Sequence, residues 1–217
     1  MLLDSDMDEQ PPARWGLDLR GAGLHGVDVS NLPLERLWGG LPGDWWREAS
    51  IEQREEAAVL LEGATATRVS LRGAFLRNAN LRGAQLQSAS LQFADLREAT
   101  LEGANLDGAD CACAEFFRAN LQGTSWFEAY ASRAGFRNAN LRHAILSEAV
   151  LWGAELRGAH LEEADLRRAD LRRADLTGAS LVGAILRDAD LRGAHLARAK
   201  LDGANLEGAE LTDASGL

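Results

Sequence analysis

A five-residue pattern repeats without a break from about Val69 to Ala214. Leucine stands at the centre of each unit, alanine lies two positions before it, and a small or polar residue lies between them. The centres fall at every fifth residue from Leu71 to Leu211, and the exceptions to leucine are Cys111, Phe116, Trp126, Ala131 and Phe136. Such regularity over two thirds of a chain indicates a repeat architecture rather than an ordinary globular core.

The period of five fits neither an amphipathic helix nor a strand, which need apolar spacings of about 3.6 and 2 residues. A chain that turns a corner in every unit does fit, because each unit then presents one leucine and one alanine to an interior. Glycine recurs at the second position after the centre, and Asn or Asp recurs directly before the centre. Turns favour these residues. The pattern therefore predicts a solenoid whose coils bury their apolar sides against each other.

These units resemble the repeats of the pentapeptide repeat family, whose consensus is A(D/N)Lxx. The stretches 164–168 (ADLRR) and 104–108 (ANLDG) match that consensus directly. The resemblance implies an all-β solenoid, a right-handed quadrilateral parallel β-helix with four units in each coil. The main solenoid, residues 59–217, would then make about eight coils. Its Ala/Leu-dominated repeat is similar to that of bacterial, especially cyanobacterial, members, whose partners are mostly undefined.

Three segments precede the main solenoid. Residues 1–14 are acidic and hold little to bury, which predicts a disordered tail. Residues 15–38 carry a degenerate copy of the repeat, enough for one N-terminal coil. Because the register then changes, residues 39–58 must leave the wall as an excursion, and a capping-box pattern starting at Ser50 predicts a short helix within it.

Trp45 and Trp46 lie in this excursion and allow two interpretations. In the first, the element packs its tryptophans on the solenoid and covers an apolar end or edge. In the second, it is a recognition element, because loops on rigid scaffolds often carry function and tryptophan is a favoured interface anchor. Projecting loops also matter in the gyrase-directed members of the family, although residues 39–58 share no motif with them.

Large outward-facing residues collect around the irregular middle of the repeat. Phe93, Tyr130 and Trp152 are predicted to lie on one face at successive levels. A clustered apolar strip on a charged rod is typical of a contact surface, while local packing without a partner remains the other interpretation. Inside the wall, Phe116 and Phe136 are predicted to stack, and the large and small centres nearby indicate an exchange of volume.

Charge and composition exclude several classes of function. The net charge is −10, of which −7 falls in residues 1–69 and −3 in residues 70–217. Nucleic-acid binding needs a basic stripe, so we expect no direct contact with nucleic acid. No apolar run is long enough to span a membrane. The first residues lack a signal-peptide core. The two cysteines are predicted on opposite sides of the wall, so we expect no disulfide between them. Both features favour a cytoplasmic protein.

No pattern for catalysis or cofactor binding is present. The glycines follow the repeat period instead of forming a phosphate-binding loop, and no nucleophile motif occurs. The histidines occupy outward positions without metal-ligand spacing; they are His25, His143, His160 and His195. We therefore expect no catalytic residue, no cofactor, no metal and no enzyme activity.

The sequence favours a non-enzymatic protein-binding or scaffold protein that contacts an unidentified protein partner through its solenoid surface and residues 39–58. The alternative is a DNA-mimic modulator or protector of DNA gyrase or topoisomerase, as in the quinolone-resistance members of the family. The weak negative charge of the wall and the rarity of Phe at the centres count against it. The C-terminus shows no capping element, which predicts a homodimer through the C-terminal coil.

Overall fold

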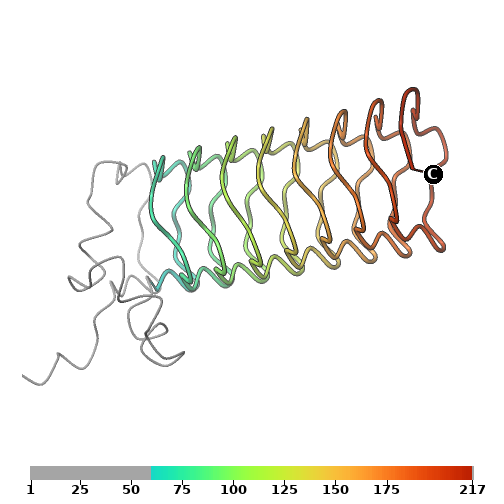
Figure 1. Ribbon diagram of the computed structural model, residues 1–217. Helices are drawn as coiled ribbons and strands as arrows, with labels where there is room; N and C mark the ends of the chain where they lie inside the picture. Colours follow the sequence, from blue (N-terminus) through green and yellow to red (C-terminus); the bar gives the residue numbers. More distant parts are fainter. Residues whose placement is uncertain (1–59, 217) are drawn as a thin grey trace, which may run out of the picture.

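The computed structural model describes residues 60–216, which form one solenoid (Figure 1). Each unit has the same local conformation, with one bridge residue directly before the centre and two turn residues directly after it. Each bridge residue pairs in parallel with the residue twenty positions further on, beginning with Leu60 and Asn80. Four units therefore complete one coil, and successive coils stack at the strand spacing of about 4.8 Å.

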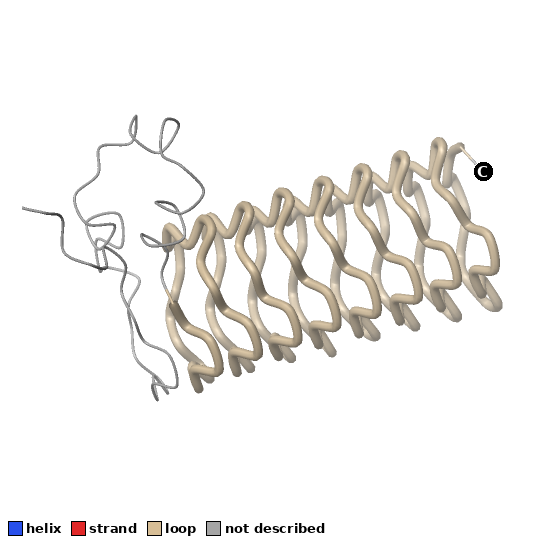
Figure 2. Tube along the Cα trace, turned by 90° about the horizontal axis from the view of Figure 1, so that it is seen from below, coloured by secondary structure: helices blue, strands red, loops and turns tan. Residues whose placement is uncertain are grey.

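Within residues 60–216 there is no helix, and every parallel bridge is isolated, so no strand extends beyond one residue. Figure 2 shows the consequence, a regular stack of coils drawn entirely as loop and turn. The predicted tail (1–14), N-terminal coil (15–38) and excursion (39–58) lie outside the described residues, as do Trp45 and Trp46.

Hydrogen bonds between successive coils hold the walls together. The centre N–H donates to the next coil, as Leu86 does to the carbonyl of Asn105 at 2.7 Å. The bridge N–H donates to the previous coil, as Gln85 does to the carbonyl of Ala64 at 2.8 Å. A third bond closes the turn within each unit. Because every unit repeats these bonds, each coil is stabilised chiefly by its two neighbours.

The second residue after the centre has a positive φ in every unit, between +55° and +71°. This is the third residue of a type II turn, a position that favours glycine. Phe93 and Cys113 nevertheless adopt it, with φ of +61° and +57°. A left-handed conformation costs a non-glycine residue roughly 1–2 kcal/mol. The N–H of each residue donates to the next coil, from Phe93 to the carbonyl of Ala112 at 3.1 Å and from Cys113 to that of Ser132 at 3.0 Å. The repeat therefore tolerates large side chains at this corner.

One backbone N–H in each unit, on the first residue after the centre, does not take part in the bonds between coils. Where an Asn or Asp stands directly before the centre, its Oδ1 accepts this N–H. The N–H of Arg82 donates to Asn80 at 3.1 Å, and that of Thr177 donates to Asp175 at 3.0 Å. The bond confirms the predicted role of the residue before the centre and explains the A(D/N)L consensus, because backbone donors need partners.

Leucine and alanine fill the core along most of the solenoid, and the middle coils replace leucine with aromatic rings. Phe116 and Phe136 stack as predicted, with centroids 5.0 Å apart and planes at 3°. Trp126, from the opposite wall, meets both rings edge-on at 5.4 and 5.7 Å. Its Nε1 donates to the Thr124 hydroxyl at 2.8 Å, which in turn donates to the Leu121 carbonyl at 2.6 Å. The buried indole N–H of Trp126 and hydroxyl of Thr124 thus both have hydrogen-bond partners.

Candidate interaction surface

Outward side chains fall on four faces, because residues twenty apart stack in successive coils. One of them, called the aromatic face below, comprises the outward residues of the units centred on Leu71, Leu91, Cys111, Ala131, Leu151, Leu171, Leu191 and Leu211. Backbone bonds join this face from coil to coil, as from Phe93 to Ala112 and from Arg133 to Trp152. The structure therefore places Phe93, Tyr130 and Trp152 on the same face.

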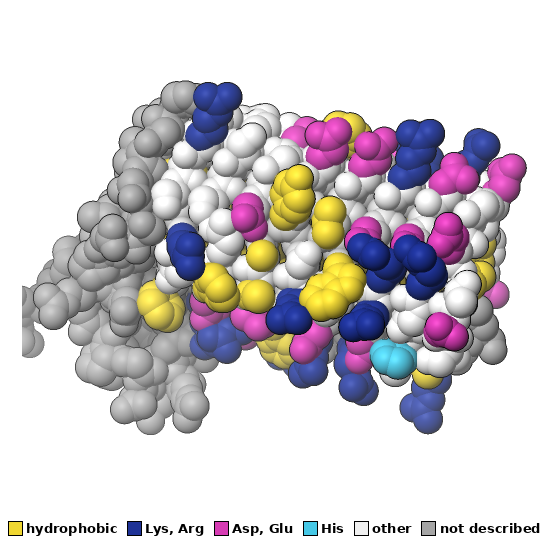
Figure 3. Space-filling view, turned by 90° about the horizontal axis from the view of Figure 1, so that it is seen from above, with side chains coloured by type: hydrophobic (Ala, Val, Ile, Leu, Met, Phe, Trp, Pro, Cys, Tyr) yellow, Lys and Arg dark blue, Asp and Glu magenta, His cyan; other side chains and the backbone are white. Residues whose placement is uncertain are grey.

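Phe93 and Tyr130 are strongly exposed, at 58% and 56% of their surface. Trp152 is partly exposed, and so are Ala112 and Cys113 between the aromatic positions. Figure 3 shows this face, with hydrophobic side chains gathered over its middle coils and charged ones toward the C-terminal coils. Exposed apolar side chains that cluster in this way are typical of a contact surface.

Arginines accompany these aromatic rings. The guanidinium of Arg72 lies 5.4 Å from the centroid of Phe93, and that of Arg133 lies 4.8 Å from the centroid of Trp152. At exposed sites such a contact contributes about 0.5–1 kcal/mol. Among the described residues, neither of these two arginines has a carboxylate within 4.0 Å. The same is true of Arg173, which lies on the same face. Three positive charges of the aromatic face are therefore not neutralised.

Arg172 and Arg192 differ, because an aspartate of the same unit holds each of them. The guanidinium of Arg172 donates to both carboxylate oxygens of Asp170, at 2.8 and 2.7 Å. Arg192 does the same to Asp190, at 2.9 and 2.5 Å. The hydrogen bond from Arg192 lowers the pKa of Asp190, although burial opposes the effect. These two arginines are neutralised within the wall and are less available to a ligand.

A cavity of about 420 Å³ opens on the aromatic face beside the indole of Trp152. It is lined by Trp152, Arg172, Arg173, Arg192, Gly193 and Asp213. The Cγ of Arg173 lies 3.6 Å from the place where a Cβ of Gly193 would stand, so this side chain extends over the glycine. An indole, an unpaired guanidinium and a missing side chain together form a hollow suited to an anionic group.

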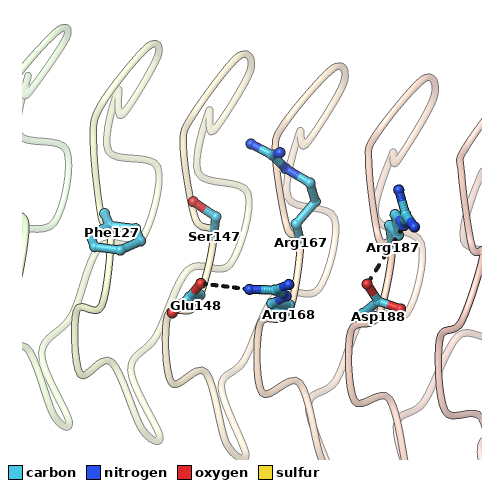
Figure 4. A pocket seen from close by; sticks show the side chains of 7 residues that line it. All are labelled: Phe127, Ser147, Glu148, Arg167, Arg168, Arg187 and Asp188. Atoms are coloured by element: carbon cyan, nitrogen blue, oxygen red, sulfur yellow. Dashed lines mark hydrogen bonds and ion pairs between the residues drawn. The ribbon is translucent and has the colours of Figure 1, made fainter.

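A second groove, of about 360 Å³, lies on the neighbouring face (Figure 4). It is lined by Phe127, Ser147, Glu148, Arg167, Arg168, Arg187 and Asp188. Arg168 pairs with Glu148 at 3.4 Å, and Arg187 pairs with Asp188 at 3.6 Å. The third arginine of this groove pairs with an aspartate of its own unit. Because each arginine has a carboxylate partner, this groove is less suited to an anion than the aromatic face.

A column of acids follows the next face, at Asp95, Glu115, Glu155 and Asp175. Arginines pair with three of them, as Arg137 does with Glu155 at 2.8 Å. Glu115 has no such partner within 4.0 Å among the described residues, and its carboxylate occupies the space over Gly135, where a Cβ would collide with it. Burial and the charge of Glu155 raise the pKa of Glu115. The sequence predicts the alternation of acids and arginines on this face but not the position of Glu115 over Gly135.

Residues 60–216 contain no group of His, Cys, Asp or Glu side chains that could hold a metal ion. Over the same range, no helix is long and apolar enough to cross a membrane. His143 lies 3.5 Å from Glu163 and His160 lies 3.5 Å from Glu162, both as surface contacts. Cys111 and Cys113 are free; burial raises the pKa of the Cys111 thiol, whereas Cys113 is partly exposed.

The family follows from the repeats themselves. The sequence profile of pentapeptide repeats matches this chain in eight copies that together span residues 60–215, so the chain belongs to the pentapeptide repeat family. No curated protein sequence matches it.

Several solved structures of pentapeptide repeat proteins are similar to this chain. HetL, a pentapeptide repeat protein involved in heterocyst differentiation regulation from the cyanobacterium Nostoc, is 26% identical over 93% of this chain and 91% of its own, with a TM-score of 0.45. QnrB1, a plasmid-mediated fluoroquinolone resistance protein, is 21% identical over 70% of this chain and 83% of its own, with a TM-score of 0.55. Rfr23, from the cyanobacterium Cyanothece, is 34% identical over 44% of this chain and 58% of its own, with a TM-score of 0.31. Of the three, only QnrB1 has a TM-score above 0.5, and this likeness supports the β-helix fold and carries no function to this chain.

Proposed function

We propose that this chain is a non-enzymatic binding or scaffold protein whose rigid solenoid presents the aromatic face to a protein partner. The observation that carries the proposal is the gathering of Phe93, Tyr130 and Trp152 on one side of an otherwise charged wall. The core at these levels is already filled by Phe116 and Trp126, so the outward rings are not needed inside. Covering apolar surface contributes roughly 25 cal/mol per Å², which a partner would gain by docking here.

Residues 39–58 belong to the proposal as a second contact element. Their structure lies outside the described residues, and the support is the pair Trp45 and Trp46, since tryptophan is enriched among the residues that dominate binding energy. A solenoid acts as a mount for such an element, because each of its coils is fixed by its neighbours.

Capture of partners from a native lysate tests the proposal. One bait is the intact chain, and a second carries Phe93→Ser, Tyr130→Ser and Trp152→Ser. A matched control carries Phe75→Ser, Phe127→Ser and Ile145→Ser, which remove exposed apolar side chains from other faces. We expect the intact chain and the control to hold the same partner and the second bait to lose it. Equal retention by all three would contradict the role of the aromatic face.

A further bait, with residues 40–57 replaced by a Gly/Ser linker, tests the excursion. Loss of the partner from this bait alone would make the excursion the contact and the solenoid its mount. Retention by this bait, together with loss from the aromatic-face variant, would assign binding to the wall.

The gyrase-directed alternative receives less support from the distribution of charge. Duplex DNA carries one negative charge per about 1.7 Å of its axis, and a mimic needs a comparably continuous field. Here, arginines and carboxylates pair along the wall, as Arg82 does with Glu102 and Arg157 with Asp175. We expect micromolar protein neither to inhibit DNA gyrase in a supercoiling assay nor to protect it from a quinolone. Either effect would favour the alternative.

We also propose an end-to-end homodimer through the C-terminal coil. Leu201, Leu206 and Leu211 are only partly buried, whereas leucines at the same positions of the preceding coils are fully buried. A second copy stacked on this coil would cover them. Light scattering should give a dimeric mass for the intact chain and a monomeric mass for Leu206→Arg. A monomeric mass for the intact chain at high concentration would contradict the proposal.

A further inference from the structure

We infer that the aromatic face recognises a carboxylate-bearing segment of the protein partner, an inference that rests on the proposed function. Six arginines of the described residues have no carboxylate within 4.0 Å, namely Arg68, Arg72, Arg118, Arg133, Arg173 and Arg198. Three of these six, Arg72, Arg133 and Arg173, lie on the aromatic face. The face with the most exposed aromatic rings is thus also the one where unpaired positive charge collects.

Two acids of this face, Asp110 and Asp170, are already engaged. The carboxylate of Asp110 accepts hydrogen bonds from the Gln92 side chain at 2.5 Å and from the Ala112 N–H at 3.1 Å. Asp170 is held by Arg172. Neither aspartate can turn toward the unpaired arginines without losing these bonds. A partner's carboxylate is therefore the group that would neutralise Arg133 and Arg173 at the lowest cost.

The cavity beside Trp152 gives this contact a definite place. Arg133 lies over the indole, and Arg173 lines the cavity with its side chain across Gly193. These two arginines are two coils apart, a distance of about 10 Å along the solenoid. A chain segment lying along the face can thus place apolar side chains on Phe93 and Tyr130 and an acidic side chain in the cavity. Asp213 also lines the cavity.

The spacing of charge favours a protein segment over nucleic acid. The three unpaired arginines span about five coils, or roughly 24 Å, whereas a nucleic-acid strand places a phosphate every few ångströms. Most phosphates on such a strand would find no partner, and they would also meet the acids of the wall. Carboxylates that are few and separated by apolar residues fit this arrangement better, and Arg and Trp are favoured at the centres of protein interfaces.

Selection of random linear peptides on the full-length chain tests the inference. The library is first depleted on the variant that carries Phe93→Ser, Tyr130→Ser and Trp152→Ser, so that the peptides kept are those that need the aromatic face. We expect these peptides to be enriched in Asp and Glu next to aromatic or aliphatic residues. Face-dependent peptides that are neutral or basic would overturn the inference while leaving the proposed function intact. Absence of any face-dependent peptide would contradict both.

Charge-matched variants sharpen the test with a selected peptide. Arg133→Gln with Arg173→Gln should weaken its binding by at least about tenfold and reduce its dependence on salt. Arg68→Gln with Arg198→Gln removes the same charge from other faces and should leave the affinity within about twofold. Equal loss in both variants would show a general effect of net charge and overturn the inference. Binding of a single-stranded thymidine oligonucleotide through Arg133 and Arg173, as tight as that of the peptide, would overturn it as well.

Discussion

The middle coils and the C-terminal coils of this solenoid follow the same backbone rule with different side chains. In the middle, Phe116, Trp126 and Phe136 replace leucine inside, and Phe93 and Tyr130 stand outside. From about residue 160 onward every centre is leucine, and the outer surface is dominated by charged and other polar residues. Both regions have the same bridges and turns. The repeat therefore determines the backbone, while departures from it give the surface its individual character.

The difference also concerns how each region is stabilised. The C-terminal coils consist of interchangeable units, and many carry an aspartate that binds both the turn N–H and the arginine of the same unit, as Asp165 does with Arg167. The middle coils depend on side chains that match one another across the core, such as Trp126 and Thr124. We expect substitutions toward the consensus to be harmless in the C-terminal coils and harmful in the middle coils.

Trp126→Leu gives the largest effect expected from this comparison. It restores the consensus at one centre but leaves a cavity next to Phe116 and Phe136. The free energy of unfolding should therefore fall by about 2–4 kcal/mol. The measurement is urea unfolding followed by circular dichroism. Adding Ala131→Leu should recover part of the loss, because the sequence predicts that these two centres exchange volume. If Trp126→Leu is neutral or stabilising, the middle coils are not specifically packed.

Thr124→Ala should have the next largest effect. It restores the consensus alanine but removes the hydroxyl that accepts the hydrogen bond of the Trp126 indole at 2.8 Å. A buried donor without a partner costs about 1–3 kcal/mol. Thr124→Ser keeps the hydroxyl and serves as the matched control. Equal stability of both variants in the same unfolding experiment would show that the hydrogen bond contributes nothing.

Asp165→Ala tests the regular region. It removes the acceptor of the Arg167 N–H, bound at 3.1 Å, and should cost about 0.5–1.5 kcal/mol. Asp165→Asn keeps a side-chain oxygen before the centre and should cost less. The hydrogen bond from Arg167 lowers the pKa of Asp165, so its contribution is present above the ordinary aspartate pKa and disappears as pH falls through the folded-state value. Unfolding curves of the intact chain and Asp165→Asn should therefore converge in acid.

Glu115→Gln should give the smallest effect, and of opposite sign. Burial and nearby Glu155 raise the pKa of Glu115, so the folded state favours the protonated carboxyl and its charged form destabilises the fold at neutral pH. Removing the charge should stabilise by roughly a few tenths of a kcal/mol, because solvent screens a partly exposed group. The gain should vanish as pH falls below the unfolded-state glutamate pKa. A gain that persists in acid would contradict this electrostatic cause.

Much of the fold could be predicted from the sequence because the repeat is strict. The leucine and alanine positions, the turns and the stacking of Phe116 on Phe136 all follow from a period of five and the four-unit coil of the family. The role of Asn and Asp before the centre was also predicted, since such residues bond to nearby backbone. The hydrogen bond between Trp126 and Thr124 was not, because it joins two departures from the pattern whose rotamers the repeat does not determine.

The candidate site could be predicted only in part. The five-residue period and the four-unit coil that the family resemblance implies place Phe93, Tyr130 and Trp152 on one face, because positions in the coil then recur every twenty residues. The pairing of arginines depends on side-chain direction: Arg172 folds back on Asp170, whereas Arg133 extends over Trp152. One signal was available, since an arginine two residues after an aspartate pairs within its unit and Arg133 has no such aspartate. No comparable feature of the sequence predicts that the carboxylate of Glu115 lies over Gly135.

Photo-crosslinking in cells shows whether the aromatic face meets a protein partner. A benzoylphenylalanine at Tyr130 would replace a ring that is 56% exposed on the aromatic face, and one at Val182, 36% exposed on another face, provides the control. We expect a discrete protein adduct from position 130 that is absent at position 182. Adducts of the same size and yield from both positions, or from position 182 alone, would contradict the assignment of the aromatic face as the contact surface.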